Sequence, residues 1–279
     1  MVRILVSKFG CIHPETVDSI FSTMEECYNR LEPHGLSLVD LYLFEYSSVL
    51  EAFLSQEYAK MGVTSSRFDE DFYAMHDAWR GIPRISISVE RIQELPELTR
   101  AGTLRHEVGH SVLHGSPQYY IFPIPHLLSE TSERLDLSAQ YMSDLLYLIS
   151  IAVKDFEVTR LLHGRGYVED QVAYAESVLK VSQDDLVAWE IGKVKPQAKI
   201  LCMVSRLKDF SCASALMSDE RLRGEIGMKL LEGMNYFPED VSTKILTIVE
   251  KLPSLLQADT LSNVNDMTRI IVEELVERR

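Results

Sequence analysis

The sequence contains little cysteine, proline or glycine, and it has fewer basic than acidic residues. Among 279 residues there are 4 Cys, 10 Pro and 13 Gly. No two cysteines have the C-x-x-C spacing of a zinc ribbon or redox motif, and a chain of this length can bury a large core without disulfides. We therefore expect reduced thiols and a cytoplasmic location.

Positive charge is also scarce. Asp and Glu number 42 against 28 Lys and Arg, which gives a formal net charge of −14. Nucleic acids and anionic membranes attract proteins with clustered basic side chains. The composition therefore argues against both as partners, and it leaves the function to be found in a local site.

Long apolar runs are missing as well. The longest one without a charge, Leu145–Val153, is far below the ~20 residues that span a bilayer. The apolar stretch at the N-terminus ends at Ser7 and Lys8, too early for a signal peptide. The sequence also lacks a G-x-S-x-G elbow, a phosphate-binding glycine loop and a dinucleotide fingerprint.

Periodicity predicts the α+β class, with a small mixed β-sheet followed by an all-α C-terminal region. Strands are expected at 2–6, 36–46, 72–76 and 82–89, and early helices at 15–31 and 47–60. Later helices are expected at 98–114, 138–163, 168–180, 183–191, 197–216, 219–234, 239–256 and 264–278, with 118–133 irregular. We expect an αβ catalytic domain over 1–165 and a helical domain over 166–279.

One motif carries chemistry. Residues 106–110 read His-Glu-Val-Gly-His, an H-E-x-x-H pattern, inside the helix expected at 98–114. Side chains four residues apart lie on one face of a helix, so His106 and His110 can bind one Zn²⁺. Glu107 lies beside them and can take a proton from a water on the metal. The motif predicts one zinc ion with Glu107 as the catalytic base.

A strand, then a helix with H-E-x-x-H, then a later helix with an acidic residue resembles the zincin metallopeptidases. The resemblance covers about 82–162 and is greatest to the gluzincin branch, including the minimal gluzincins. The metzincin pattern fails, because Leu113 and Ser116 stand where it has Gly and its third His. The resemblance implies a peptidase with a third zinc ligand, a Glu on a helix downstream.

Glu157 is the predicted third metal ligand. Its helix is apolar on nearly every side, and a buried carboxylate needs a partner. Zinc would be one partner, and Lys154 or Arg160 on the same helix would be others. Asp155 and a further histidine are the alternative ligands. Gluzincins often carry an Asp four residues after the ligand Glu, where this chain has Leu161.

Several residues are candidates for supporting roles. With Leu161 in the family's Asp position, Asp155 or Asp144 could orient a zinc histidine instead. His114 follows His110 by one turn, and a structural or supporting role suits it better than ligation, because three points along one straight helix cannot all reach one ion.

A second group would act on the substrate. The resemblance implies that a His or Tyr polarises the substrate carbonyl, and His126, His163 and Tyr167 are candidates. The strand 85–89 would pair with an extended substrate, or it is only the last strand of the sheet. The loop 118–126 would line a pocket or form a lid, or it is only a packed aromatic connection.

The sequence thus predicts a zinc-dependent metallopeptidase that cleaves peptides or unfolded protein. The alternative is a zincin-like fold whose zinc site is structural or latent, and which binds or regulates through its helical C-terminal half.

Overall fold

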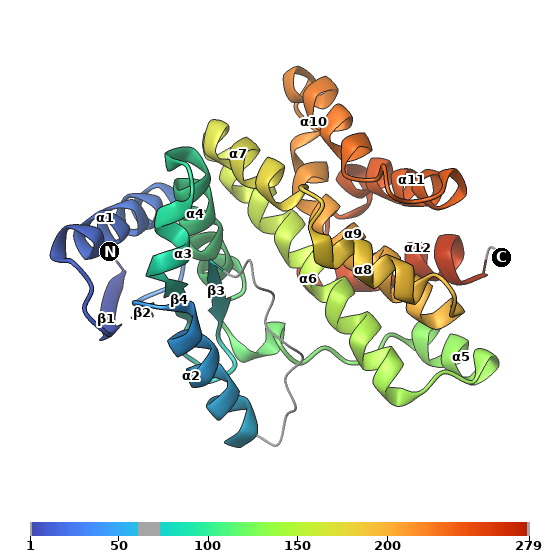
Figure 1. Cartoon of the computed structure of the whole chain (residues 1–279), viewed down its shortest axis with the longest axis horizontal. Helices are drawn as coiled ribbons and strands as arrows, with labels where there is room; N and C mark the ends of the chain where they lie inside the picture. The colour runs from blue at the N-terminus through green and yellow to red at the C-terminus, as the bar shows by residue number, and fades with distance from the viewer. Residues whose placement is uncertain (1, 61–72, 278–279) are drawn as a thin grey trace. The chain divides into compact units, whose positions relative to one another are not determined.

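The computed structural model describes residues 2–60 and 73–277. Within them the chain folds into twelve α-helices and a four-stranded mixed sheet (Figure 1), so the predicted α+β class is confirmed. Two compact units form: unit 1 comprises 1–120 and 164–174, and unit 2 comprises 121–163 and 175–279. These bounds differ from the expected division after residue 165, since the chain passes from one unit to the other three times.

The sheet belongs to unit 1 and has the strand order β1-β2-β4-β3. Its strands are β1 (Arg3–Phe9), β2 (Leu38–Phe44), β3 (Ala74–Asp77) and β4 (Arg84–Ser88). The pairs β1–β2 and β2–β4 are parallel, and β3 is antiparallel to β4. All four fall where strands were expected, although Phe72, the first residue expected in β3, lies outside the described residues. Gly81 adopts φ +91° in the β3–β4 turn, a conformation that glycine tolerates best.

Among its described residues, unit 1 also contains four complete α-helices. They are α1 (Pro14–Leu31), α2 (Ser47–Lys60), α3 (Val89–Glu94) and α4 (Glu97–Leu113). Helix α4 packs on α1, β3 and β4, and the hydroxyls of Tyr28 and Ser111 join α1 to α4 at 2.7 Å. Helix α2 buries Leu50 and Leu54 against Phe44 of β2. The short α3 was not expected, because its first residue, Val89, continues the alternation of the preceding strand.

A buried group of charges also holds this sheet. Arg84 of β4 pairs with Asp77 of β3 and Glu57 of α2, each at 2.8 Å, and all three side chains are less than 10% exposed. Burial raises the pKa of Asp77 above its usual value, and Arg84 opposes that rise. Because each buried charge has an opposite partner, the group links two strands and a helix.

Among the described residues of unit 2, all of the regular secondary structure is helical. Its helices are α5 (His126–Leu135), α6 (Ala139–Gly164), α7 (Glu169–Val178), α8 (Gln183–Gly192), α9 (Pro196–Leu216), α10 (Glu220–Glu232), α11 (Glu239–Leu255), α12 (Thr260–Ile271) and a π-helical turn η2 (Val272–Glu277); α6 and α7 each have one end in unit 1. Helix α9 contacts α8, α10 and α11. The expectation that 118–133 is irregular was wrong from His126 onward, because Pro125 precedes a helix instead of interrupting one.

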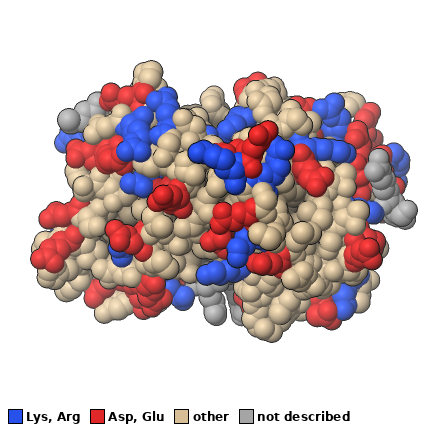
Figure 2. Space-filling model, turned by 90° about the horizontal axis from the view of Figure 1, so that it is seen from above, with Lys and Arg blue, Asp and Glu red and all other residues tan. Residues whose placement is uncertain are grey.

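Within the described residues, no helix is long and apolar enough to cross a membrane. Figure 2 shows acidic and basic side chains interspersed on the face that it draws. The net negative charge therefore does not gather on that face as one acidic patch.

Candidate metal centre on helix α4

The predicted motif lies on one regular helix in unit 1. Helix α4 begins after Pro96 and ends at Leu113. At its C-terminus the backbone N–H of His114 donates a hydrogen bond to the carbonyl of His110. His106 is 1% exposed and Glu107 7% exposed. Polar side chains this deeply buried require partners, so their mutual geometry is informative.

The two histidines of the motif face one another. His106 Nε2 and His110 Nε2 lie 3.1 Å apart. Two nitrogens bound to one tetrahedral Zn²⁺, each at about 2.0–2.1 Å, lie about 3.3 Å from each other. The pair therefore has nearly the separation that a shared zinc ion requires, and the donor set fits the predicted metal.

His114 lies behind His110 rather than beside the paired nitrogens. It is fully buried, and its Nδ1 lies 3.2 Å from His110 Nδ1. If His110 donates its Nδ1 proton across this contact, its Nε2 is left with the lone pair that a metal needs. The position supports the predicted supporting role of His114, in which it orients His110.

The structure adds two residues that the sequence analysis did not assign to the site. His76 of β3 stacks on His110, with ring centroids 6.0 Å apart and the planes within 3° of parallel. The hydroxyl of Tyr120 hydrogen-bonds to His76 Nδ1 at 2.8 Å. Burial raises the pKa of Tyr120 well above its usual value, and the charges of Asp77 and Glu107 raise it further. Tyr120 is therefore a neutral phenol at physiological pH.

We call His76, His106, His110 and His114 the histidine cluster. Sequence spacing indicated three of its members, since they follow one another at four-residue intervals along α4. His76 has no such signal, because it reaches the cluster only through the antiparallel pairing of β3 with β4. Tyr120 was included only in the loop 118–126, whose pocket-lining role remains a prediction.

A close approach of α7 holds α4 in place. A Cβ built on Gly102 of α4 would lie 2.3 Å from the carbonyl oxygen of Asp170, so only glycine fits there. The Asp170 carboxylate binds Arg105 at 2.6 Å, and Glu26 of α1 lies 3.3 Å from the same guanidinium. These contacts fix the helix that carries the motif.

Tyr167 belongs to this anchoring network. Its hydroxyl donates to Glu26 at 2.8 Å, and its ring lies between the guanidiniums of Arg30 and Arg105, 4.3 and 4.4 Å from its centroid. Burial raises its pKa, and Cys27 and Glu26 add to the rise. These described contacts suit a structural role, and the predicted action of Tyr167 on a carbonyl has no support from them.

Glu157, the predicted third ligand, lies on α6 in unit 2 and is 6% exposed. The hydroxyl of Thr260 donates to its Oε2 at 2.8 Å, and the Asn263 amide donates to its Oε1 at 2.5 Å. Both donors come from α12. The buried carboxylate thus has local hydrogen bonds, and its role as a zinc ligand remains a prediction.

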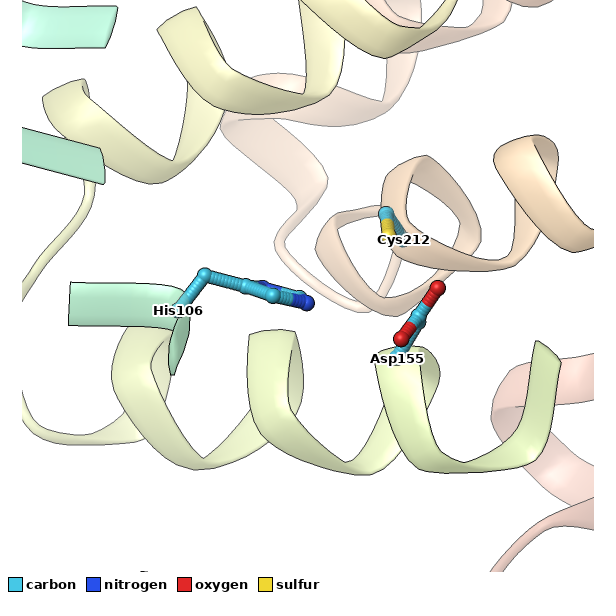
Figure 3. A group of neighbouring side chains, drawn as sticks. All are labelled: His106, Asp155 and Cys212. Carbon is cyan, nitrogen blue, oxygen red and sulfur yellow. The ribbon is translucent and has the colours of Figure 1, made fainter. Parts of the chain in front are cut away.

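Asp155, the alternative ligand, also lies on α6. Figure 3 draws it with Cys212 of α9, and it labels His106 of unit 1 as well. Within unit 2, burial raises the pKa of the Cys212 thiol well above its usual value, and the nearby charge of Asp155 raises it further. The Cys212 thiol is therefore protonated at neutral pH.

The other predicted residues of unit 2 have ordinary partners. His163 Nε2 lies 3.3 Å from Asp219. The ring of His126 lies 3.4 Å from Glu130 with its side chain 87% exposed. Asp144 accepts a hydrogen bond from Gln140 at 2.7 Å. Their predicted roles at a metal site remain predictions.

The expectation that the strand 85–89 pairs with an extended substrate was wrong. Strand β4 is already paired on both sides, with β2 and with β3. Among the described residues, β3 lies at the edge of the sheet, and it carries His76. The edge next to the histidine cluster is therefore that of β3.

Comparisons with models of protein families, with curated proteins and with solved structures found no match to this chain. The residues and their geometry are therefore what a functional proposal rests on.

Proposed function

We propose that this protein is a zinc-dependent metallopeptidase of the zincin type, with His106 and His110 as two ligands of one zinc ion. The observation that carries the proposal is the 3.1 Å separation of their Nε2 atoms. Zinc supplies Lewis-acid chemistry, polarising a substrate carbonyl and lowering the pKa of a bound water. The third ligand is assigned from the sequence alone, as Glu157 with Asp155 and a further histidine as alternatives.

The remaining chemistry belongs to side chains of unit 1. Glu107 would accept a proton from the attacking water and pass it to the leaving amine. Tyr120, kept neutral by burial and by nearby negative charge, would donate a hydrogen bond to the developing oxyanion. An extended peptide or unfolded segment would add through backbone hydrogen bonds to β3, which is the outer strand of the sheet among the described residues.

Metal analysis tests the ligands. We expect wild-type protein to hold one zinc ion per chain, and His106→Ala and His110→Ala to lose it. His13→Ala is the matched control, because His13 is 72% exposed and lies outside α4. Zinc retained in both ligand variants would overturn the site.

Cleavage of an unfolded protein tests the chemistry. We expect Glu107→Gln to keep its zinc and to lose activity by about 10²–10⁴-fold, the usual contribution of a general base. Glu97→Gln, on the exposed side of the same helix, should cleave like wild type. Equal cleavage by Glu107→Gln and wild type would contradict the mechanism.

The second candidate is a zincin-like protein with a structural or latent zinc site, which binds partners through unit 2. The hydrogen bonds of Glu157 to Thr260 and Asn263 favour it, because they give this carboxylate partners other than a metal. Zinc bound stoichiometrically with no cleavage of any unfolded protein would support this candidate over the first.

A further inference from the structure

Unit 2 contains a pocket of about 760 Å³, which lies in the size range of small-molecule sites. Its walls come from the junctions α5–α6 and α8–α9, the first turns of α9 and α11, and η2. All of its lining residues belong to unit 2. The pocket is therefore a feature of that unit alone, and the proposed peptidase does not use it.

The inner lining is apolar. Tyr141 is 7% exposed, Met203 3% and Val241 1%, and Leu275 and Val276 of η2 complete this part of the wall. Such a surface gains free energy when an apolar group displaces water from it. An alkyl chain matches it, since these side chains offer few polar atoms to pair with a ligand.

The rest of the lining is basic, in a chain whose net charge is −14. Four lysines line the pocket, Lys193, Lys195, Lys199 and Lys244, against one acidic residue, Asp240. Lys193 also pairs with Glu190 at 2.6 Å. A surplus of ammonium groups around an apolar cavity favours a ligand with a negative head.

Helix geometry adds to this preference. Helix α9 begins at the pocket with neither a side-chain cap nor an acidic residue in its first turn. Helix α11 also begins there, but its first turn carries Glu239 and Asp240. An uncapped N-terminus of a long helix carries partial positive charge and donors for an anion. The N-terminus of α9 therefore adds to the lysines at the same opening.

We propose that this pocket binds a single-chain anionic amphiphile, with its alkyl chain against Met203 and Val241 and its head near Lys195 and Lys199. A carboxylate or a phosphate head satisfies the same lysines, so the shared chemistry is an anion on an alkyl chain. The site is independent of the zinc centre, and its occupancy does not require peptidase activity.

Calorimetric titration of the full chain tests this with laurate and monododecyl phosphate, below their micelle concentrations. We expect saturable binding at one site per chain, with the tighter ligand identifying the preferred head. Acetate lacks the chain and dodecyltrimethylammonium has the opposite charge, so each should bind at least about tenfold more weakly. Equal binding of dodecyltrimethylammonium, or uptake that never saturates, would overturn the proposal.

Variants locate the site. We expect Lys195→Gln with Lys199→Gln to weaken binding of the preferred anion by about tenfold, since two charge-assisted contacts are lost. The matched control is Lys180→Gln, an exposed lysine of unit 2 outside the pocket, which should bind like wild type. Circular dichroism verifies that the double variant is folded. Undiminished affinity in that folded variant would contradict the assignment.

Discussion

Buried charges in unit 1 share one partner, whereas in unit 2 Arg206 and Glu157 bind mainly backbone carbonyls and neutral side chains. In unit 1, Arg84 joins two carboxylates, and three imidazoles follow one another along α4. In unit 2, Arg206 is 2% exposed, donates to the carbonyls of Val178, Leu179 and Gly233, and has one carboxylate partner, Asp209, at 3.2 Å. Glu157 accepts from neutral donors.

The two arrangements differ in which groups compensate the cost of burying a polar side chain. Where polar side chains depend on one another, removing one leaves the others buried without compensation. Where each is bound to backbone, the loss stays local. We therefore expect large and non-additive effects in unit 1 and smaller, separate ones in unit 2.

The largest effect is expected at Arg84. Arg84→Met removes the cation that pairs with the buried Asp77 and leaves Glu57 with its other partner, Arg80 at 2.6 Å, which costs about 3–5 kcal/mol of unfolding free energy. Urea unfolding followed by circular dichroism measures this loss, with Arg3→Met on the exposed side of β1 as the control. Adding Asp77→Asn should cost less than the sum of the two single changes. If the two losses of unfolding free energy are strictly additive, Arg84 and Asp77 do not depend on each other and the contrast with unit 2 fails.

His114 is expected to have the next largest effect. His114→Phe keeps an aromatic ring but removes the partner of His110 Nδ1, so zinc should bind about 10–100-fold more weakly. Titration against a chromophoric chelator gives the affinity, and His13→Phe is the exposed control. An unchanged affinity would mean that His114 does not orient His110.

Asn263 tests unit 2. Asn263→Ala removes a donor to Glu157 and should lower the free energy of unfolding by about 1–3 kcal/mol. Asn235→Ala, at an exposed position, should have little effect. Zinc affinity measured on the same variant sharpens the comparison. A fall would support Glu157 as the third ligand, and an unchanged value would assign its contacts to the fold.

The smallest effect is expected at Asp219, the N-cap of α10. Hydrogen bonds from Arg221, chiefly that of its side chain, hold the pKa of Asp219 well below its usual 3.8. The folded state therefore favours the carboxylate, and this contribution is present above pH 3.8 and is lost as the pH falls below it. Asp219→Asn keeps a capping side chain without the charge.

Urea midpoints at pH 6 and pH 3 measure this contribution. Wild type should lose slightly more stability than Asp219→Asn when the solution is acidified between these values. An equal loss in the two proteins would show that the charge of Asp219 does not matter to folding.

Helix positions were predictable because their signals are local. The apolar spacing and the flanking prolines and glycines placed α4, α6 and α9 within a few residues of their observed bounds. Helix α5 was missed because Pro125 was interpreted as part of an irregular loop. The six-residue α3 is too short to show a helical period.

The neighbours of the motif on α4 were predictable for the same reason. His106, Glu107 and His110 follow from one spacing on one helix, as does the nearness of His114. His76 could not be inferred, because its place depends on the register of β3 against β4. A pairing between strands is set by packing and turn geometry rather than by a local period.

The anchor of α4 has a consequence for the order in which the protein is made. The motif helix is complete at Leu113, but Asp170, which meets Gly102 and Arg105, is separated from it by the whole of α6. At translation rates of about 5–20 residues per second, Asp170 is synthesised some seconds after helix α4, which it contacts. On a nascent chain the histidines of α4 are therefore made before the contacts of Asp170 that fix their helix. A fragment that stops after residue 165 would lack these contacts.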